Sequence, residues 1–265
     1  MRNKINLVKN KRIGRVLFIV EGLDDEMRIL HRIFCTIYGY NYEKLDRNGK
    51  YAKYTPKDTT NDVNSSIFVI NTKESNIKDI EDIKDADGYL NNLFVKLINQ
   101  YQFPVDKSAI YYIFDRDFDS NKDAKLIEKL IYKLRNSRDG FDDEYDKGLL
   151  LLSYPAIESF ITANFIEDAW NLQFQNGSDL KRYLHNFQYT SQRINEESLI
   201  SSVNELLKVF DKLGVSEYDL DDCYKTNKIV YDYEENNYKE KRKYNVISLL
   251  SIALLDLGLI EIDIT

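Results

Sequence analysis

Four short segments, apolar at almost every position, restrict most strongly how this 265-residue chain can fold. A strand with one exposed face alternates apolar and polar residues, whereas a continuously apolar run suits a strand that is buried on both faces. Such strands are typical of parallel sheets that helices cover on both sides. The four segments are Val16–Val20, Ile67–Asn71, Ala109–Phe114 and Gly148–Ser153.

Helical patterns separate these strands. Apolar residues recur there three and four positions apart, which is the spacing that lines one face of a helix. Residues 40–65 are instead polar, without a continuous apolar pattern, and we expect an irregular loop or a hairpin. The alternation of strands and helices predicts an α/β fold with a Rossmann-like parallel sheet flanked by helices. The predicted helices cover residues 24–38, 88–101, 122–134 and a segment that starts at Pro155.

The pattern changes after about residue 165. Segments 196–212 and 245–257 have helical spacing, and only Lys228–Tyr233 suits a strand. We therefore expect two parts, an α/β domain over residues 1–165 and a mostly helical C-terminal region over residues 166–265.

Charge and rare side chains exclude several classes of protein. The net charge is −7, from 37 basic and 44 acidic residues, so contact with nucleic acid would need a local basic patch or metal ions. Two histidines and two widely spaced cysteines exclude a histidine-rich zinc site and a disulfide framework. The longest uncharged apolar stretch, from Val246, is too short to span a bilayer. The N-terminus lacks the apolar core of a signal peptide, and we expect a cytoplasmic protein with no membrane partner.

Acidic side chains stand at the ends of two predicted strands. The first strand ends at Glu21, with Asp25 four residues later, and the third ends in Asp115 and Asp117. Ligands of open parallel sheets bind at the carboxyl ends of the strands, so these acids converge if the two strands are neighbours. Carboxylates that close repel one another, and a hard divalent cation removes the repulsion. Oxygen ligands without histidine favour Mg²⁺ or Mn²⁺.

The acidic run continues to Asp119, which has the alternative role of capping the next helix. An EF-hand that starts at Asp115 is excluded, because Leu126 stands where its twelfth position needs an acid.

In this context the segments IVEGLDDE and YIFDRDFDS resemble the TOPRIM domain. That family has a glutamate at the end of its first strand, usually followed by glycine, and a D-x-D after its third. The resemblance covers about residues 12–165. Glu21 matches the family glutamate, Asp115 and Asp117 match the D-x-D, and Asp25 matches an additional acid of OLD-type members. The resemblance thus implies a TOPRIM-like catalytic domain over residues 1–165.

A second segment, LLLSYPAIESFI, resembles the helix start after the fourth strand in the OLD, RloB and related groups of TOPRIM proteins. By this resemblance Glu158 reaches the metal site; an equally good alternative is an acid favoured by the dipole at a helix N-terminus. Many members of these groups belong to bacterial anti-phage systems, and one is the partner of an ATPase in the PARIS defence system.

The resemblance implies a Mg²⁺- or Mn²⁺-dependent endonuclease that hydrolyses phosphodiester bonds of DNA or RNA, tRNA included, as an effector of phage defence. Asp115 and Asp117, supported by Asp25, would hold the metal. Glu21 would act as general base or acid, or bridge a second ion. Arg116 and Lys122 would contact substrate phosphates; for Arg116, strand alternation favours the alternative of an outward ion-pair partner.

Two other functions remain open. A TOPRIM-like module that no longer cuts could sense or dock on an ATPase partner. Nucleotidyl transfer, as in primases, is a second enzymatic alternative, although the chain has no accompanying zinc region. A homodimer and an ATPase are the expected protein partners, beside nucleic acid.

Overall fold

The computed structural model describes most of the chain. The described residues are 4–22, 24–46, 51–57, 65–71, 86–118, 121, 123–142, 144–215 and 218–263.

The four apolar segments form the centre of one sheet, as predicted. They are parallel strands in the spatial order β8, β6, β2, β5, so that β2 lies between β5 and β6. Their apolar side chains are buried, because helices cover both faces of the sheet. The strand bounds are β2 Arg15–Val20, β5 Ser66–Asn71, β6 Ser108–Asp115 and β8 Gly148–Tyr154.

The edges of this sheet are antiparallel, so the sheet is mixed and the prediction of a parallel sheet holds only for its centre. The polar segment 40–65 contributes a hairpin of β3 (Asn41–Lys44) and β4 (Tyr51–Thr55), which continues the sheet beyond β5. At the other end, β11 (Ile247–Ser248) and β7 (Arg135–Asn136) pair with β8. A hairpin connection reverses the chain, which accounts for the antiparallel pairing of β3 with β4.

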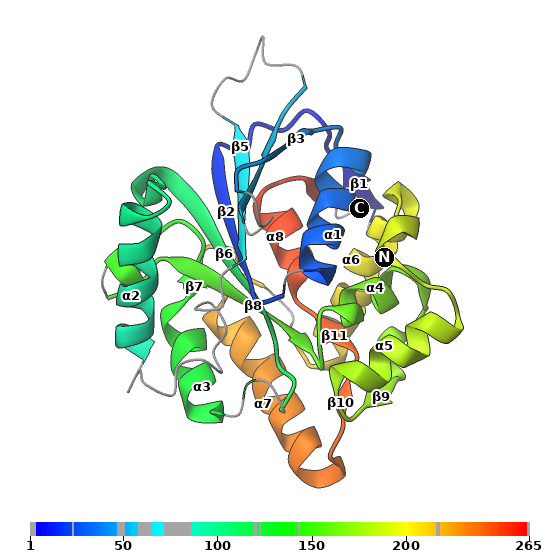
Figure 1. The fold of residues 1–265 in the computed structure, drawn as a ribbon. Coiled ribbons are helices and arrows are strands. Elements are labelled where there is room, and N and C mark those ends of the chain that lie inside the picture. The colour runs from blue at the N-terminus through cyan, green and yellow to red at the C-terminus, as the bar shows by residue number, and fades with distance from the viewer. Residues whose placement is uncertain are drawn as a thin grey trace.

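Helices follow the central strands as predicted. Figure 1 shows α2 and α3 on one side of the sheet, with α7 beside α3, and α1 and α8 on the other side. The first helix, α1, continues as a π-helical segment over Arg32–Ile37. The bounds are α1 Asp25–His31, α2 Ala86–Asn99, α3 Ala124–Lys133 and α4 Glu158–Phe165.

The C-terminal region is mostly helical, as predicted, but Lys228–Tyr233 is not a strand. It lies within α7, whose buried residues recur at helical spacing and include polar ones such as Asn227 and Glu234. The helix predicted over 245–257 is shorter because residues 244–245 and 247–248 form short strands. The helices are α5 Gly177–Asn186, α6 Glu196–Lys212, α7 Tyr224–Lys241 and α8 Leu250–Asp256. Short strands are β9 Gln173–Phe174, β10 Tyr244–Asn245 and β12 Ile260–Asp263. Single 3₁₀ turns are Val105–Lys107, Glu144–Asp146, Ala169–Asn171 and Ser191–Arg193.

Both ends of the described chain pair with each other. Strand β1 (Lys4–Leu7) runs antiparallel to β12, so part of the basic N-terminal segment forms a strand. Together with β11, this pairing joins the C-terminal region to the α/β part. The division at residue 165 stays a prediction.

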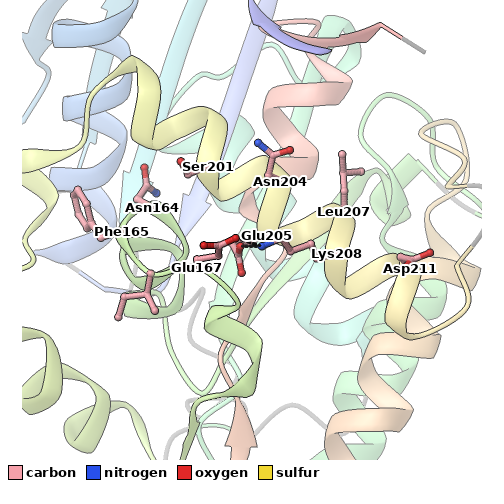
Figure 2. Close-up of a pocket in the computed structure, with 10 residues that line it drawn as sticks. Asn164, Phe165, Glu167, Ser201, Asn204, Glu205, Leu207, Lys208 and Asp211 are labelled. Carbon is pink, nitrogen blue, oxygen red and sulfur yellow. Dashed lines mark hydrogen bonds and ion pairs between the residues drawn. The ribbon is translucent and has the colours of Figure 1, made fainter. Parts of the chain in front are cut away.

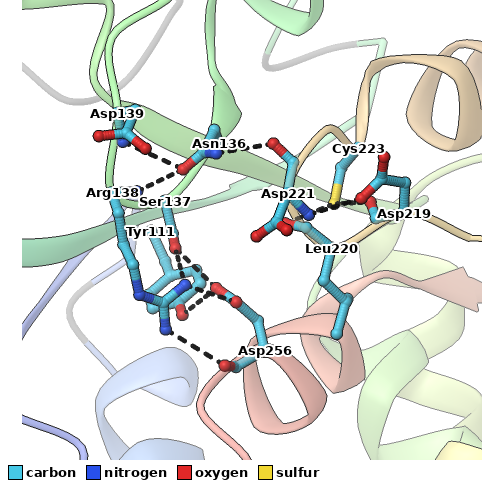
Figure 3. A network of polar contacts seen from close by, with 10 residues as sticks. All are labelled: Tyr111, Asn136, Ser137, Arg138, Asp139, Asp219, Leu220, Asp221, Cys223 and Asp256. Atoms are coloured by element: carbon cyan, nitrogen blue, oxygen red, sulfur yellow. Dashed lines mark hydrogen bonds and ion pairs between the residues drawn. The ribbon is translucent and has the colours of Figure 1, made fainter.

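A buried carboxylate fastens α8 to the central sheet. Asp256 accepts hydrogen bonds from Tyr111 Oη of β6 at 2.5 Å, Ser137 Oγ at 2.6 Å and Arg138 Nη1 at 2.6 Å (Figure 3). Three donors around one buried anion replace the water that it loses on folding.

Within the described ranges, each helix is too short or too polar to cross a membrane.

Candidate acidic site at the strand ends

The carboxyl ends of β2 and β6 lie side by side. Glu21 follows β2, and its Oε2 accepts a hydrogen bond from the backbone N–H of Asp115, the last residue of β6, at 3.0 Å. Asn121 Nδ2 donates to the same oxygen at 3.2 Å. The first and third apolar strands are neighbours, which is the condition that we set for the acids to converge, and Glu21 is turned toward the end of β6.

Gly22 leaves space for a second glutamate. Glu26 Oε1 accepts a hydrogen bond from Gly22 N at 2.9 Å. A Cβ atom on residue 22 would lie only 2.3 Å from Glu26 Oε2, so a larger residue would displace that carboxylate. The glycine after Glu21 thus permits two acids to pack against one turn of backbone.

Glu26 is not among the predicted site residues, although the sequence contains a signal for it. Glu26 is 5% exposed and lies three and four residues before the buried Ile29 and Leu30, on the same face of α1. An acid at a position where the helical pattern requires an apolar residue indicates a functional or specially paired side chain.

Helix α4 brings Glu158 to the same place. The backbone N–H of Ile157, at the start of this helix, donates to Asp115 Oδ1 at 2.8 Å, and Glu158 follows in the first turn with its side chain largely buried. We call Glu21, Asp25, Glu26, Asp115 and Glu158 the acidic centre.

Burial and mutual repulsion disfavour the charged forms of these acids. The pKa of Asp115 lies well above its ordinary value because of burial and then the charges of Glu26, Glu21 and Glu158. Burial, with the charges of Glu21 and Asp25, raises the pKa of Glu26 to about 7. Burial also raises the pKa of Glu158 to about 7, helped by Asp25 and Glu26 and opposed by Lys181. The acidic centre therefore holds protons at neutral pH or requires a cation.

One lysine already supplies part of that positive charge. Lys181 Nζ, from α5, lies 2.5 Å from Asp25 Oδ2 and 3.4 Å from Glu158 Oε1. Its side chain is 62% exposed, so it contacts the acidic centre from the solvent side. No local motif marks this residue, because it is 156 positions from Asp25 along the chain.

Asp115 and Asp117 are held by different helices. Alternate residues of an extended chain point to the same side, but β6 ends at Asp115, so this rule does not extend to Asp117. Asp117 Oδ2 accepts a hydrogen bond from Gly177 N at the start of α5, at 2.9 Å. Asp117 therefore binds the start of α5, the helix that carries Lys181.

Arg116 does not fit the prediction of a substrate-binding cation. Its side chain is 0% exposed; Nε donates to Glu235 Oε1 of α7 at 2.7 Å, and Nη1 donates to the carbonyl oxygen of Asn121 at 2.8 Å. The alternative of an ion-pair partner is correct, but the pair lies inside the protein and not at the surface. Strand alternation turned this side chain away from the aspartates, and the C-terminal helix α7 covers it.

Two other residues of the predicted motif, Asp119 and Lys122, lie outside the described residues.

The kind of ligand atoms in the acidic centre fits a hard divalent cation, because all of them are carboxylate oxygens. The ammonium group of Lys181 already places one positive charge beside the carboxylates of Asp25 and Glu158. Within the described part of the chain, however, no three acidic, histidine or cysteine side chains stand in a metal-holding arrangement. Several of these carboxylate oxygens bind backbone N–H groups instead, so side chains would have to turn for an ion to bind.

A cavity elsewhere lacks these features. It has a volume of about 910 Å³ and lies between the end of α4 and α6 (Figure 2). Its basic residue, Lys208, is bound to Glu205 at 2.8 Å and Asp168 at 2.9 Å, and Glu167 and Asp211 add further negative charge. None of the predicted site residues lines it, and its charge disfavours a phosphate ligand.

A scan against protein-family models finds no match to this chain, and searches of curated proteins and of solved structures also find none.

Proposed function

We propose that this protein is a TOPRIM-like, metal-dependent endonuclease that hydrolyses phosphodiester bonds at the acidic centre. The observation that supports it best is the contact of Glu21 with the end of β6, 3.0 Å from Asp115 N, with two further buried acids beside it. Five carboxylates in one place are costly for a merely structural site, and they suit the charge of a dication, which in turn attracts a phosphate. The resemblance in the sequence adds the reaction class.

In this proposal Glu21 and Asp115 hold the ion, supported by Asp25 and Glu158. A bound Mg²⁺ or Mn²⁺ would polarise the scissile phosphate and offset the charge that develops on its oxygens. Glu26, whose pKa is raised to about 7, is partly protonated near neutral pH, and a bound cation would favour its ionised form. Asp117 fixes the start of α5 and with it the position of Lys181.

In this proposal Lys181 takes the role that the sequence suggested for Arg116. Its ammonium group is exposed and lies within 3.4 Å of Glu158 Oε1, so it can contact a phosphate that reaches the acidic centre. In the reaction, water attacks phosphorus, the bond to the leaving oxygen breaks, and the proton of the water passes to a carboxylate, for which Glu21 is the candidate.

The test is cleavage of supercoiled plasmid, total tRNA and a single-stranded oligonucleotide, each with Mg²⁺ or Mn²⁺ and with EDTA. We expect cleavage that needs the divalent cation. Glu21→Gln should lower the rate by about two to four orders of magnitude, the range for removal of a catalytic carboxylate or electrostatic group.

Glu43→Gln is the matched control, because it makes the same chemical change on the exposed strand β3. It should cut like the unaltered protein. Equal rates for Glu21→Gln and Glu43→Gln would reject the assignment of the active site.

The second candidate is a non-cutting module that binds nucleic acid or an ATPase partner. The ion pairs of Lys181 favour it, because they already neutralise part of the acidic centre without a metal. Binding of nucleic acid that persists with no cleavage in either metal would support this candidate. A role as an effector of phage defence, with an ATPase partner or as a homodimer, is proposed on the resemblance alone.

A further inference from the structure

A groove along the outer face of α1 starts beside the acidic centre. Its volume is about 400 Å³, and α1, the hairpin β3–β4 and the turn Ser191–Arg193 line it. Arg28, one of the lining residues, has Nη1 3.7 Å from Oδ1 of Asp25, which belongs to the acidic centre. A polymer that reaches the acidic centre can therefore extend into this groove.

The groove carries positive charge in a protein whose net charge is −7. Arg28 and Arg32 line it together with a single acid, Asp24. The Arg28 side chain is 55% exposed, and its nearest contacts with Asp24 and Asp25 are long, at 3.5 and 3.7 Å. Exposed ion pairs of this kind are weak, so a phosphate can compete for the guanidinium group. Arg32 is anchored by its Nε, which donates to the carbonyl oxygen of Ile194 at 2.7 Å.

Aromatic side chains line the groove together with these arginines. Tyr42 is 44% exposed. The rings of Tyr42 and His31 meet edge to face, with their centroids 5.0 Å apart. Below them Tyr54 is fully buried, and among the described residues its hydroxyl has no hydrogen-bond partner. The exposed ring of Tyr42 offers a surface on which a planar base can stack.

We infer that this groove binds an unpaired stretch of nucleic acid, with backbone phosphates on Arg28 and Arg32 and a base stacked on Tyr42. Stacking on a protein side chain needs a base whose face is not covered by its neighbours, which selects single strands, loops and bulges over a duplex. The inference deepens the proposed function, because it names the substrate class and the path of the strand beside the acidic centre; binding itself needs no cleavage.

The experiment measures binding of a short fluorescein-labelled oligonucleotide of mixed sequence by fluorescence anisotropy in EDTA. Single-stranded DNA, single-stranded RNA and a blunt DNA duplex are compared. We expect the single strands to bind more tightly than the duplex. Tyr42→Ala should weaken single-strand binding by about tenfold or more, and Tyr42→Trp should retain it. Arg28→Gln should lower the slope of log K against log salt by about one.

Tyr132→Ala is the matched control, because Tyr132 has a similar exposure of 41% but lies on α3, outside this groove. It should bind like the unaltered protein, and circular dichroism should show that each variant is folded. The inference is overturned if single strands do not bind, if the duplex binds better, or if Tyr42→Ala and Tyr132→Ala behave alike.

The two proposals can fail separately. Cleavage that depends on Glu21 while Tyr42→Ala leaves KM and binding unchanged would refute only the groove. Binding that depends on Tyr42 and Arg28, without cleavage in Mg²⁺ or Mn²⁺, would refute only the hydrolysis.

Discussion

At the scale of single residues, the concentration of buried acids in the acidic centre lowers the stability of the folded state. Glu26 is buried against Gly22 and hydrogen-bonded to its backbone N–H. A carboxylate in that position loses water and gains like-charged neighbours, which disfavours its ionised form. A neutral residue of the same shape would remove this free-energy cost. An acid at position 26 is therefore explained if its charge serves to bind a ligand.

The first prediction concerns pH. Because the pKa of Glu26 is about 7 in the folded chain against 4.5 as its ordinary value, the folded state holds the proton longer than the unfolded state. Its contribution to stability is therefore lost as pH rises from about 4.5 through 7. Glu26→Gln should raise the free energy of unfolding at pH 8 by up to about 3 kcal/mol and change it little at pH 4.

Urea denaturation of both proteins in EDTA at several pH values checks this. Glu43→Gln, with the same change at an exposed position, should follow the unaltered protein. Parallel pH curves for Glu26→Gln and the unaltered protein would show that Glu26 is not responsible.

At the scale of elements, the polar network of Figure 3 holds α8 against the central sheet. Asp256 has a largely buried side chain, with 4% exposed, and it joins α8 to β6 through Tyr111 and to the segment after β7 through Ser137 and Arg138. Removing the anion leaves these donors without their acceptor.

The second prediction follows from this network. Asp256→Ala should lower the free energy of unfolding by about 2–4 kcal/mol, between the loss of one charged hydrogen bond and the breaking of a fully buried ion pair. Asp221→Ala, at an exposed carboxylate of the neighbouring segment, should change it by no more than about 0.5 kcal/mol. Thermal and urea denaturation would measure both, and equal effects would contradict the assigned role.

Elements with a strong periodic signal could be predicted from the sequence. The central strands have continuous apolar runs, and α6 has a helical pattern over the whole of Glu196–Lys212. By contrast, α7 buries polar residues such as Asn227 and Glu234, which carry no apolar pattern. A two-residue strand such as β11 is defined only by its pairing with β8.

The site could be predicted only where its residues stand next to a strand end. Glu21 and Asp115 follow apolar runs directly, so topology alone brings them together. Lys181 and Asn121 reach the same place through contacts 156 and 100 residues distant in sequence. The buried position of Arg116 depends on Glu235 in α7, and no local pattern contains that information.

At the scale of the whole molecule, the C-terminal region completes the sheet and supplies partners for buried groups of the α/β part. Strand β11 pairs with β8, and β12 pairs with β1. Asn227 Nδ2 donates to the carbonyl oxygen of Leu150 in β8 at 2.8 Å.

The third prediction is that residues 1–165 alone do not form a stable fold. Removal of the rest would leave the Arg116 guanidinium without its carboxylate and would uncover the apolar side of α4 that packs on α6. A buried charge without a partner costs several kcal/mol, a large part of the stability of a domain. Size-exclusion chromatography and thermal melting of this fragment, beside the 265-residue chain, provide the check. A monomer with a cooperative melting transition would contradict the prediction and support two separate domains.

The ion pair of Arg116 with Glu235 also connects two distant parts of the chain. Arg116 lies between Asp115 and Asp117 in the chain, and its partner stands on α7, 119 residues away. A largely buried contact thus joins α7 directly to the chain between Asp115 and Asp117. We expect a displacement of α7 to move Arg116 and, with it, these two flanking aspartates.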